Sequence, residues 1–362
     1  MAKRYYRPEL DALRFFAFAC VFLHHQTISH RSWLQHIADT GELGMCIFFM
    51  LSAYLIVTIL LREKDVTGTV SWKAFAARRI LRIWPLYFGI MFLIFGLGRF
   101  WPLAHLTWRE VIAFSVLIGN VYILRHGWGI GPIGPLWSIS IEEQFYLAVP
   151  MIVRVSSRRT MAAMCIATIV FAYVVLVWLG CRGATPRIGV WVNSFVQFQF
   201  FAAGGLIALW LYESQQTLSA PARCCLAIGG LALWYFAMVH FHLSSGISSN
   251  PTQLVCGYLL VLAGTTMIFL SPMNLKMRIP QPLVYLGKIS FGLYLFHELF
   301  IDVIFRTSDL WPQIHFFQRH PDFSGPVAFS LTVAAAALSY HFFERPILKF
   351  KERFETIHTR PA

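Results

Sequence analysis

Residues 9–25, ELDALRFFAFACVFLHH, form an apolar run of the kind that crosses a membrane, yet the run contains ionisable side chains. A transmembrane helix needs about 20 mainly apolar residues, and this run continues to residue 28. Ionisable groups in such a helix are costly, so they usually face a protein interior or a water-filled cavity. Asp11, Arg14 and His25 therefore indicate that the first span does more than anchor the chain.

The composition of the whole chain is that of a membrane protein. Of 362 residues, 57% are hydrophobic and 13% are charged, whereas a soluble domain carries about 25% charged residues. Apolar runs extend over the full length, which predicts a single membrane domain over residues 1–362. The formal charge of +13 comes from Lys and Arg in short loops. That pattern is typical of cytoplasmic loops and argues against a nucleic-acid partner.

The pattern predicts an all-α polytopic fold, because the runs are continuous and do not alternate as in a membrane β-barrel. Basic residues at the N-terminus and in the loop 62–82 predict that both lie in the cytoplasm. An even number of spans then places both termini there. We predict ten spans, centred on residues 10–28, 43–61, 84–101, 138–153, 161–179, 195–211, 224–241, 253–270, 285–304 and 326–343.

One further apolar stretch, WREVIAFSVLIGNVYIL (108–124), complicates the count. A single crossing there would reverse the sides of all later basic loops. We therefore predict a re-entrant or interfacial segment near 108–137, which the Gly/Pro-rich run 126–137 favours. The alternative is eleven spans with one loop that breaks the charge rule.

Two smaller features limit the chemistry. The seven Cys show no paired spacing, so we expect neither a disulfide framework nor a metal site. The first apolar run carries charges and has no small-residue cleavage site after it, so we expect it to be retained as a span.

Helical phase selects particular side chains in the first span. Residues eleven apart on a helix differ by about 20° in direction and about 16 Å in height. Arg14 and His25 thus share one stripe at opposite ends, with Asp11 one turn below Arg14, whereas His24 points about 100° away. Each residue also has a simpler interpretation without a catalytic role. His25 would be a histidine that touches water at the outer interface of the membrane, and Arg14 an arginine that extends its charged end to the interface as an anchor.

Two other stretches carry candidate groups. In AARRILRIWPLYF (76–88), Arg79 and Arg82 project together and suit a phosphorylated ligand, unless they only anchor the helix. In WSISIEEQFYLAVP (137–150), Glu142 shares a helix face with Tyr146. It is either a catalytic carboxylate or a structural hydrogen-bond acceptor.

The C-terminal third holds two more such stretches. KISFGLYLFHELF (288–300) places His297 and Glu298 in a predicted span, followed by Asp302. His297 is either a second cavity histidine or a hydrogen-bonded core residue. In SYHFFERPILKF (339–350), the plainest interpretation of Glu344 and Arg345 is an ion pair at a helix end.

These stretches, in this order, resemble membrane-bound acyltransferase family three. The family pattern combines an Arg and a His separated by ten residues, Arg-x-x-Arg, Trp-Ser-hydrophobic-Ser-hydrophobic-Glu-x-x-Phe-Tyr, Ser-x-Gly-x-Tyr-x-x-His and Glu-Arg-Pro. Ala53 departs from it, because the family usually has Gly there, which concerns packing. The matching residues are Arg14 and His25; Arg79 and Arg82; Trp137, Ser138, Ser140, Glu142, Phe145 and Tyr146; Ser290, Gly292, Tyr294 and His297; and Glu344, Arg345 and Pro346.

The resemblance implies an O-acyltransferase that moves an acyl group, usually acetyl, from cytoplasmic acyl-CoA to a hydroxyl of a carbohydrate or glycoconjugate. It implies that His25 and Glu142 are catalytic, and that Arg14, Arg79 and Arg82 hold the donor. His25 would accept the hydroxyl proton, or would carry the acyl group itself. No permanently bound cofactor or metal is expected. The residues expected to line the cavity are Asp11, Trp137, Ser140, Tyr146, Tyr294 and His297.

The resemblance also implies a location in the bacterial cytoplasmic (inner) membrane. Some relatives carry an additional soluble hydrolase-like domain, and we expect this chain to act without one, alone or with a separate extracytoplasmic acyl-transfer partner. The main alternative class is a carrier or flippase for a sugar or lipid-linked substrate. It does not explain an arginine pair at the mouth of a cytoplasmic loop.

Overall fold

The structure is a computed structural model. It describes residues 5–26, 32–101, 104–129, 131–182, 185–212, 214, 217–243, 247–248, 250–275, 277–306 and 321–357.

Long apolar helices dominate the described residues, as the sequence predicts. Seven helical segments are long and apolar enough to cross a membrane, and each overlaps one predicted span. They are Leu34–Thr67, Trp72–Leu97, Arg158–Cys181, Ser194–Leu211, Ala220–His240, Pro251–Leu270 and Phe323–Phe354. The protein is therefore an integral membrane protein.

The other three predicted spans are also helical, but two of them contain several charged residues and the third is broken into two helices. They are α1 (Pro8–His25), α7 (Trp137–Val155), and the pair α13 (Gln281–Lys288) and α14 (Ser290–Ile301). At 1.5 Å per residue, α1 and α7 are each about 28 Å long, close to the thickness of the hydrocarbon core. The count of ten spans and the cytoplasmic termini stay predictions.

The remaining long elements are α3 (Gly44–Thr67), α4 (Trp72–Leu97), α8 (Arg158–Cys181), α10 (Ser194–Leu211), α11 (Ala220–His240), α12 (Pro251–Leu270) and α16 (Pro321–Ser339). The short elements are α2 (Ser32–Thr40), α5 (Trp108–Ser115), α6 (Gly119–His126), α9 (Arg187–Trp191), α17 (Arg345–Lys351), the 3-10 turns η1 (Gly41–Leu43), η3 (Gly131–Leu136) and η7 (Glu352–Phe354), and the π-helical turns η4 (Asp302–Arg306) and η6 (Tyr340–Glu344). One exception to the all-α prediction is a two-residue antiparallel pair, β1 (Thr185–Pro186) and β2 (Ile247–Ser248).

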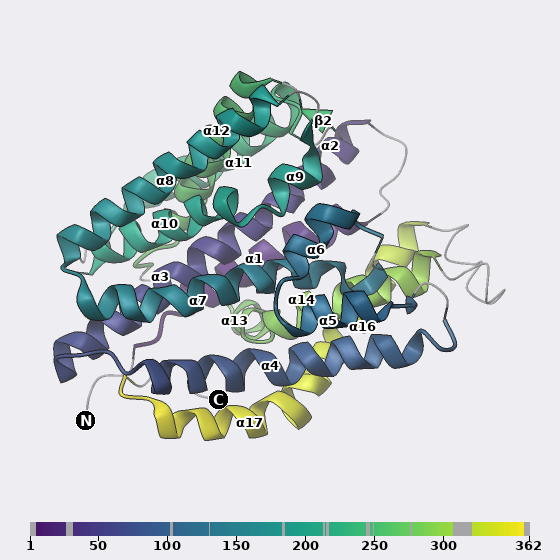
Figure 1. Ribbon diagram of the computed structural model, residues 1–362, viewed down its shortest axis with the longest axis horizontal. Helices are drawn as coiled ribbons and strands as arrows, with labels where there is room; N and C mark the ends of the chain where they lie inside the picture. Colours follow the sequence, from purple (N-terminus) through teal and green to yellow (C-terminus); the bar gives the residue numbers. More distant parts are fainter. Residues whose placement is uncertain are drawn as a thin grey trace.

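Helix α1 lies in the middle of the bundle, where it contacts α3, α13 and α14 (Figure 1). On one side α3 packs on α10, which packs on α8, and α11 packs on α12. On the other side α17 lies along α4 (Figure 1). A Cβ added to Gly204 would come within 2.3 Å of the Met50 carbonyl oxygen and 3.1 Å of Ala53 Cβ. Ala53, which departs from the family pattern, thus lies in the close contact between α3 and α10.

The segment after residue 107 does not form a spanning helix. Helices α5 and α6 have eight residues each, about 12 Å, and Leu117 between them has a φ of +61°. A capping box of Thr107 and Glu110 fixes the start of α5. This geometry fits the predicted re-entrant or interfacial segment and not an eleventh span.

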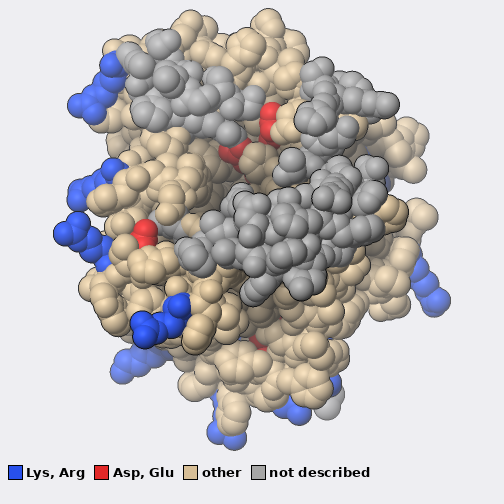
Figure 2. All heavy atoms as spheres, turned by 90° about the vertical axis from the view of Figure 1, so that its right-hand side faces the viewer, with Lys and Arg blue, Asp and Glu red and all other residues tan. Residues whose placement is uncertain are grey.

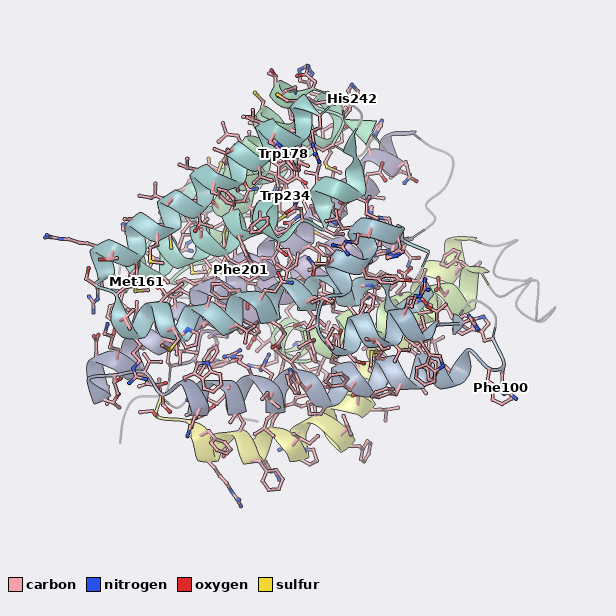
Figure 3. The ribbon with its side chains drawn as sticks, viewed as in Figure 1. Phe100, Met161, Trp178, Phe201, Trp234 and His242 are labelled. Carbon is pink, nitrogen blue, oxygen red and sulfur yellow. The ribbon has the colours of Figure 1, made fainter. Side chains whose placement is uncertain are left out.

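Large hydrophobic side chains cover the outside of the bundle, as expected for a lipid-facing surface. Trp178 on α8 is 52% exposed, and Phe100 after α4 projects away from the helices (Figure 3). Inside, Phe201 stacks on Phe49 with ring centroids 4.9 Å apart, and Trp234 donates to Thr265 between α11 and α12 (Figure 3).

Candidate active site

The last turn of α1 brings His25 against α14. His25 Nδ1 lies 3.0 Å from Glu298 Oε2, and Glu298 is buried. A carboxylate this close to Nδ1 favours a proton on that side of the imidazole and orients the ring by charge, which leaves Nε2 as the basic nitrogen. The sequence places Glu298 beside His297 but gives no sign that it reaches His25, because the contact joins two helices far apart in the chain.

The neighbouring His24 also has a carboxylate partner. Its Nε2 lies 3.6 Å from Glu42 Oε2, which is buried in η1. Both histidines border the same cavity. Helical phase separates His24 from the stripe of Arg14 and His25, but both histidines line this cavity at the end of α1, where the helix stops.

His297 lies directly behind His25. Its side chain is fully buried, and its ring centroid is 5.1 Å from that of His25. Its Nδ1 is 2.5 Å from the Tyr294 carbonyl oxygen, which can only accept, so the proton is on Nδ1. Of the two alternatives from sequence, the geometry matches the hydrogen-bonded core residue: His297 lines none of the three cavities described below and packs behind the histidine that does.

The cavity at this end has a volume of about 560 Å³, and we call it the histidine cavity. Aromatic rings form much of its wall, with Trp137 at a ring-centroid distance of 6.3 Å from Trp128 and 5.9 Å from Trp191. Its chemistry-bearing residues are His24, His25, Glu42, Trp128, Trp137, Trp191, Tyr294 and Glu298.

A narrower cavity of about 110 Å³ continues toward the other end of the bundle, and we call it the middle cavity. Glu142 lies here and accepts a hydrogen bond of 2.8 Å from Tyr146, whose hydroxyl is 2.6 Å from Ser52 Oγ. The carboxylate beside His25 is thus Glu298, and Glu142 belongs to the arginine side. The polar residues of the middle cavity are Arg14, Ser52, Arg79, Arg82, Ser138, Glu142, Tyr146, Ser290 and Tyr294.

A third cavity of about 110 Å³ opens where α4 and α17 meet, and we call it the arginine cavity. The predicted Asp11–Arg14 pair is present here, with Arg14 Nη1 2.5 Å from Asp11 Oδ1. The guanidinium carbon Cζ of Arg79 lies 5.6 Å from the centroid of the Tyr146 ring. The charged residues of this cavity are Arg7, Asp11, Arg14, Arg78, Arg79, Arg82, Lys351, Glu352 and Glu355.

The three cavities follow one another and share walls. Arg14, Arg79 and Arg82 border both the arginine and the middle cavities. Met45 and Tyr294 border both the middle and the histidine cavities. The shared residues mark one path from a basic mouth to the His25–Glu298 pair.

Ser140 differs from its predicted place in the cavity wall. Its side chain is fully buried, and its hydroxyl accepts the Gly119 backbone N–H at 3.1 Å, which ties α6 to α7. Ser138 does border the path, because its hydroxyl is 2.9 Å from that of Tyr294. Tyr294 in turn donates to the Pro135 carbonyl at 2.7 Å and so holds η3 against α14.

Arg78, next to the Arg79 and Arg82 motif, and Glu344 both make structural contacts. Arg78 is buried, pairs with Glu63 at 2.9 Å and donates to the Phe354 carbonyl at 2.6 Å. Glu344 ends the π-helical turn η6, and Ser339 donates to it at 3.4 Å.

The surface around the C-terminal end of α4 carries both acidic and basic side chains. Figure 2 shows this end, with acidic side chains recessed near the middle and Lys and Arg projecting from the margin. Among the residues described in this view, the Lys and Arg side chains lie at separate places around the margin.

The fold and the site define a membrane-embedded protein with a path that joins clustered arginines to a histidine–carboxylate pair. The chain belongs to the family described as the acyltransferase domain, which matches residues 7–341. No solved structure matches the chain.

Curated relatives of this chain include proteins of Staphylococcus aureus. A protein of strain MSSA476, named provisionally as an O-acetyltransferase, is 26% identical over 393 residues, which cover 99% of this chain and 60% of the relative. O-acetyltransferase OatA of strain NCTC 8325 is 26% identical over 368 residues, covering 95% of this chain and 57% of the relative. This chain therefore spans about 60% of the length of the relatives it matches.

Proposed function

We propose that this protein is a membrane-bound O-acyltransferase that moves an acyl group, usually acetyl, from acyl-CoA to a hydroxyl of a carbohydrate or glycoconjugate. The observation that carries the proposal is the row of three cavities that share walls from Arg79 and Arg82 to His25. The family membership and the printed names of the relatives support the O-acetyl chemistry and favour an enzyme over a carrier.

The arginine cavity suits the phosphorylated part of the donor. Guanidinium groups form paired hydrogen bonds to phosphate oxygens. Because Arg14, Arg79 and Arg82 also border the middle cavity, phosphates held by them direct the thin pantetheine arm into that cavity. The thioester then points toward Tyr294 and the histidine cavity. A cytoplasmic donor places the arginine end inside, in the bacterial cytoplasmic membrane.

The histidine cavity suits the acceptor. Its volume of about 560 Å³ lies in the range of small-ligand sites. Trp128, Trp137 and Trp191 offer flat apolar faces against which a sugar ring can pack, and the nearby carboxylates accept hydrogen bonds from hydroxyls.

The His25–Glu298 pair supplies the proton chemistry. The acceptor oxygen attacks the thioester carbonyl carbon and gives its proton to His25 Nε2, the C–S bond breaks, and the proton passes to the leaving CoA thiolate. In the acyl-histidine variant, Nε2 attacks the thioester carbonyl carbon and the C–S bond breaks to release CoA thiolate. The acceptor oxygen then attacks the acyl carbon, the N–C bond breaks to regenerate His25, and the hydroxyl proton passes to the thiolate. Glu298 holds the ring in both variants and stabilises the imidazolium that forms in the first.

Binding and turnover of labelled acetyl-CoA by the purified protein test the proposal. We expect the wild type to bind acetyl-CoA, the double variant Arg79→Ala with Arg82→Ala to bind it at least ten-fold more weakly, and His25→Ala to bind it but transfer no acetyl group. The control pair is Arg154→Ala with Arg159→Ala, since these exposed arginines line none of the three cavities. Binding that is absent in the wild type, or equal in the two double variants, would contradict the proposal.

A further inference from the structure

A cluster of three metal-ligand side chains lies where α1 meets α14. His25, His297 and Glu298 each offer one ligand atom, and these three atoms lie within 4.8 Å of one another. His297 and Glu298 are adjacent in the chain and His25 is far from them, so the sequence does not show that the three side chains meet. His297 is fully buried and Glu298 is buried, so a cation held there would be largely shielded from solvent.

The tautomer of His297 provides a second, independent observation. Its Nδ1–H is donated to the Tyr294 carbonyl, which leaves the lone pair on Nε2. That Nε2 is buried and has no hydrogen-bond partner among the described residues. Metal-ligating histidines usually show this arrangement, with one nitrogen donating to a carbonyl or carboxylate and the other facing the metal. A buried polar atom without a partner is otherwise costly.

We propose that His25, His297 and Glu298 form a binding site for a divalent cation of the zinc type. Two imidazoles and a carboxylate suit zinc, cobalt or nickel, whereas magnesium and calcium prefer sites made of oxygen. In a tetrahedral zinc site the ligand atoms are about 3.3 Å apart, so the distances between the three ligand atoms need to shorten by at most about 1.5 Å. His25 and Glu298 border the histidine cavity, so the fourth position opens into it.

The site has a consequence for catalysis that rests on the proposed function. A neutral imidazole has one free lone pair, and coordination uses it. A metal on His25 therefore prevents this residue from taking a proton or an acyl group. We infer that the cation inhibits acyl transfer at the acceptor step and leaves donor binding in the arginine cavity unchanged.

Cobalt(II) titration tests the site without reference to activity. The full chain is purified in detergent with a tag that lacks histidine, and the visible absorption of tetrahedral Co²⁺ is followed. We expect one equivalent to bind, with displacement by Zn²⁺. His297→Ala and Glu298→Gln should each weaken binding at least ten-fold, and circular dichroism shows whether these variants are folded.

His24→Ala is the matched control, because His24 borders the same cavity but lies outside the cluster. It should bind Co²⁺ as the wild type does. Folded wild-type protein that binds neither Co²⁺ nor Zn²⁺ stoichiometrically, or equal affinity in wild type and His297→Ala, would overturn the site. Since the readout is spectroscopic, it holds whether or not the protein transfers acetyl groups.

An activity assay tests the inhibitory role separately. We expect Zn²⁺ to lower acetyl transfer and EDTA to restore it, with acetyl-CoA binding unchanged throughout. Transfer that is lost on EDTA treatment and regained with Zn²⁺ would overturn inhibition.

Discussion

At the scale of single residues, the role proposed for His25 depends on a carboxylate that comes from another helix. Glu298 Oε2 lies 3.0 Å from His25 Nδ1, while His297 Nδ1 is already donated to a backbone carbonyl. Only His25 of the two combines an orienting carboxylate with access to the histidine cavity. In the proposed mechanism His25 meets the substrates, Glu298 orients it, and His297 packs behind it.

Glu298→Gln is predicted to lower kcat for acetyl transfer by roughly 10²-fold, within the range that positioned acid–base groups contribute. An amide can present its NH₂ to His25 Nδ1, which selects the wrong tautomer. The KM for acetyl-CoA should stay within about threefold, since the donor phosphates bind in the arginine cavity. Steady-state kinetics in proteoliposomes provide both values.

Glu298→Asp should recover part of kcat, because the carboxylate is kept at a shorter reach. A loss confined to KM, or an equal loss in Gln and Asp variants, would show that Glu298 serves packing and not the orientation of His25.

At the scale of elements, close helix contacts position the donor side of the path. A Cβ on Gly287 of α13 would be 1.8 Å from the backbone oxygen of Asp11 on α1, so only glycine fits there. Asp11 in turn holds Arg14. The fit of α13 against α1 therefore supports an arginine that borders two cavities.

Gly287→Ala is predicted to push α13 away from α1, to lower the unfolding temperature by several degrees, and to weaken acetyl-CoA binding. Overpacking of this kind costs about 1–3 kcal/mol, and more where the obstacle is backbone. Gly96→Ala on α4 is the control, since its Cβ would meet nothing within 4 Å. Thermal unfolding in detergent measures the difference, and equal stability of the two variants would contradict the predicted contact.

The helices themselves are largely predictable from the sequence, and their breaks are not. Seven apolar runs became helices long enough to span. The segment near 108–137 is broken, but its first break, between α5 and α6, lies at Leu117 and so precedes the Gly/Pro-rich run. The break between α13 and α14 at Ile289 and the π-helical turns η4 and η6 lie inside apolar runs. Their hydrogen-bond register is set by packing against other helices, which no local pattern encodes.

At the scale of the whole molecule, the motifs predict which groups matter but not which of them meet. Arg14, Arg79, Arg82 and Glu142 come from three helices and border one cavity. Ser140 belongs to the same sequence motif as Glu142. Its hydroxyl nevertheless accepts a hydrogen bond from the Gly119 backbone N–H, because it faces α6 and not the path. Phase along one helix is local information, whereas the path depends on the placement of all its walls.

The join between the middle and histidine cavities is where this path is most easily tested. Met45 on α3 is 6% exposed and, like Tyr294, borders both cavities. Met45→Trp therefore places a bulkier side chain, an indole ring, at the join. We expect acetyl-CoA affinity within about threefold of the wild type, because the phosphate-binding arginines are unchanged, and acetyl transfer at least ten-fold slower, because the thioester no longer reaches His25.

Met164→Trp is the matched control, since Met164 is 41% exposed on α8 and lines none of the three cavities. It should bind donor and transfer acetyl groups as the wild type does. Wild-type transfer by a folded Met45→Trp protein would mean that the acyl group reaches the acceptor by another route. Loss of donor binding together with transfer would mean that the donor itself occupies the histidine cavity, with the arginines outside its binding site.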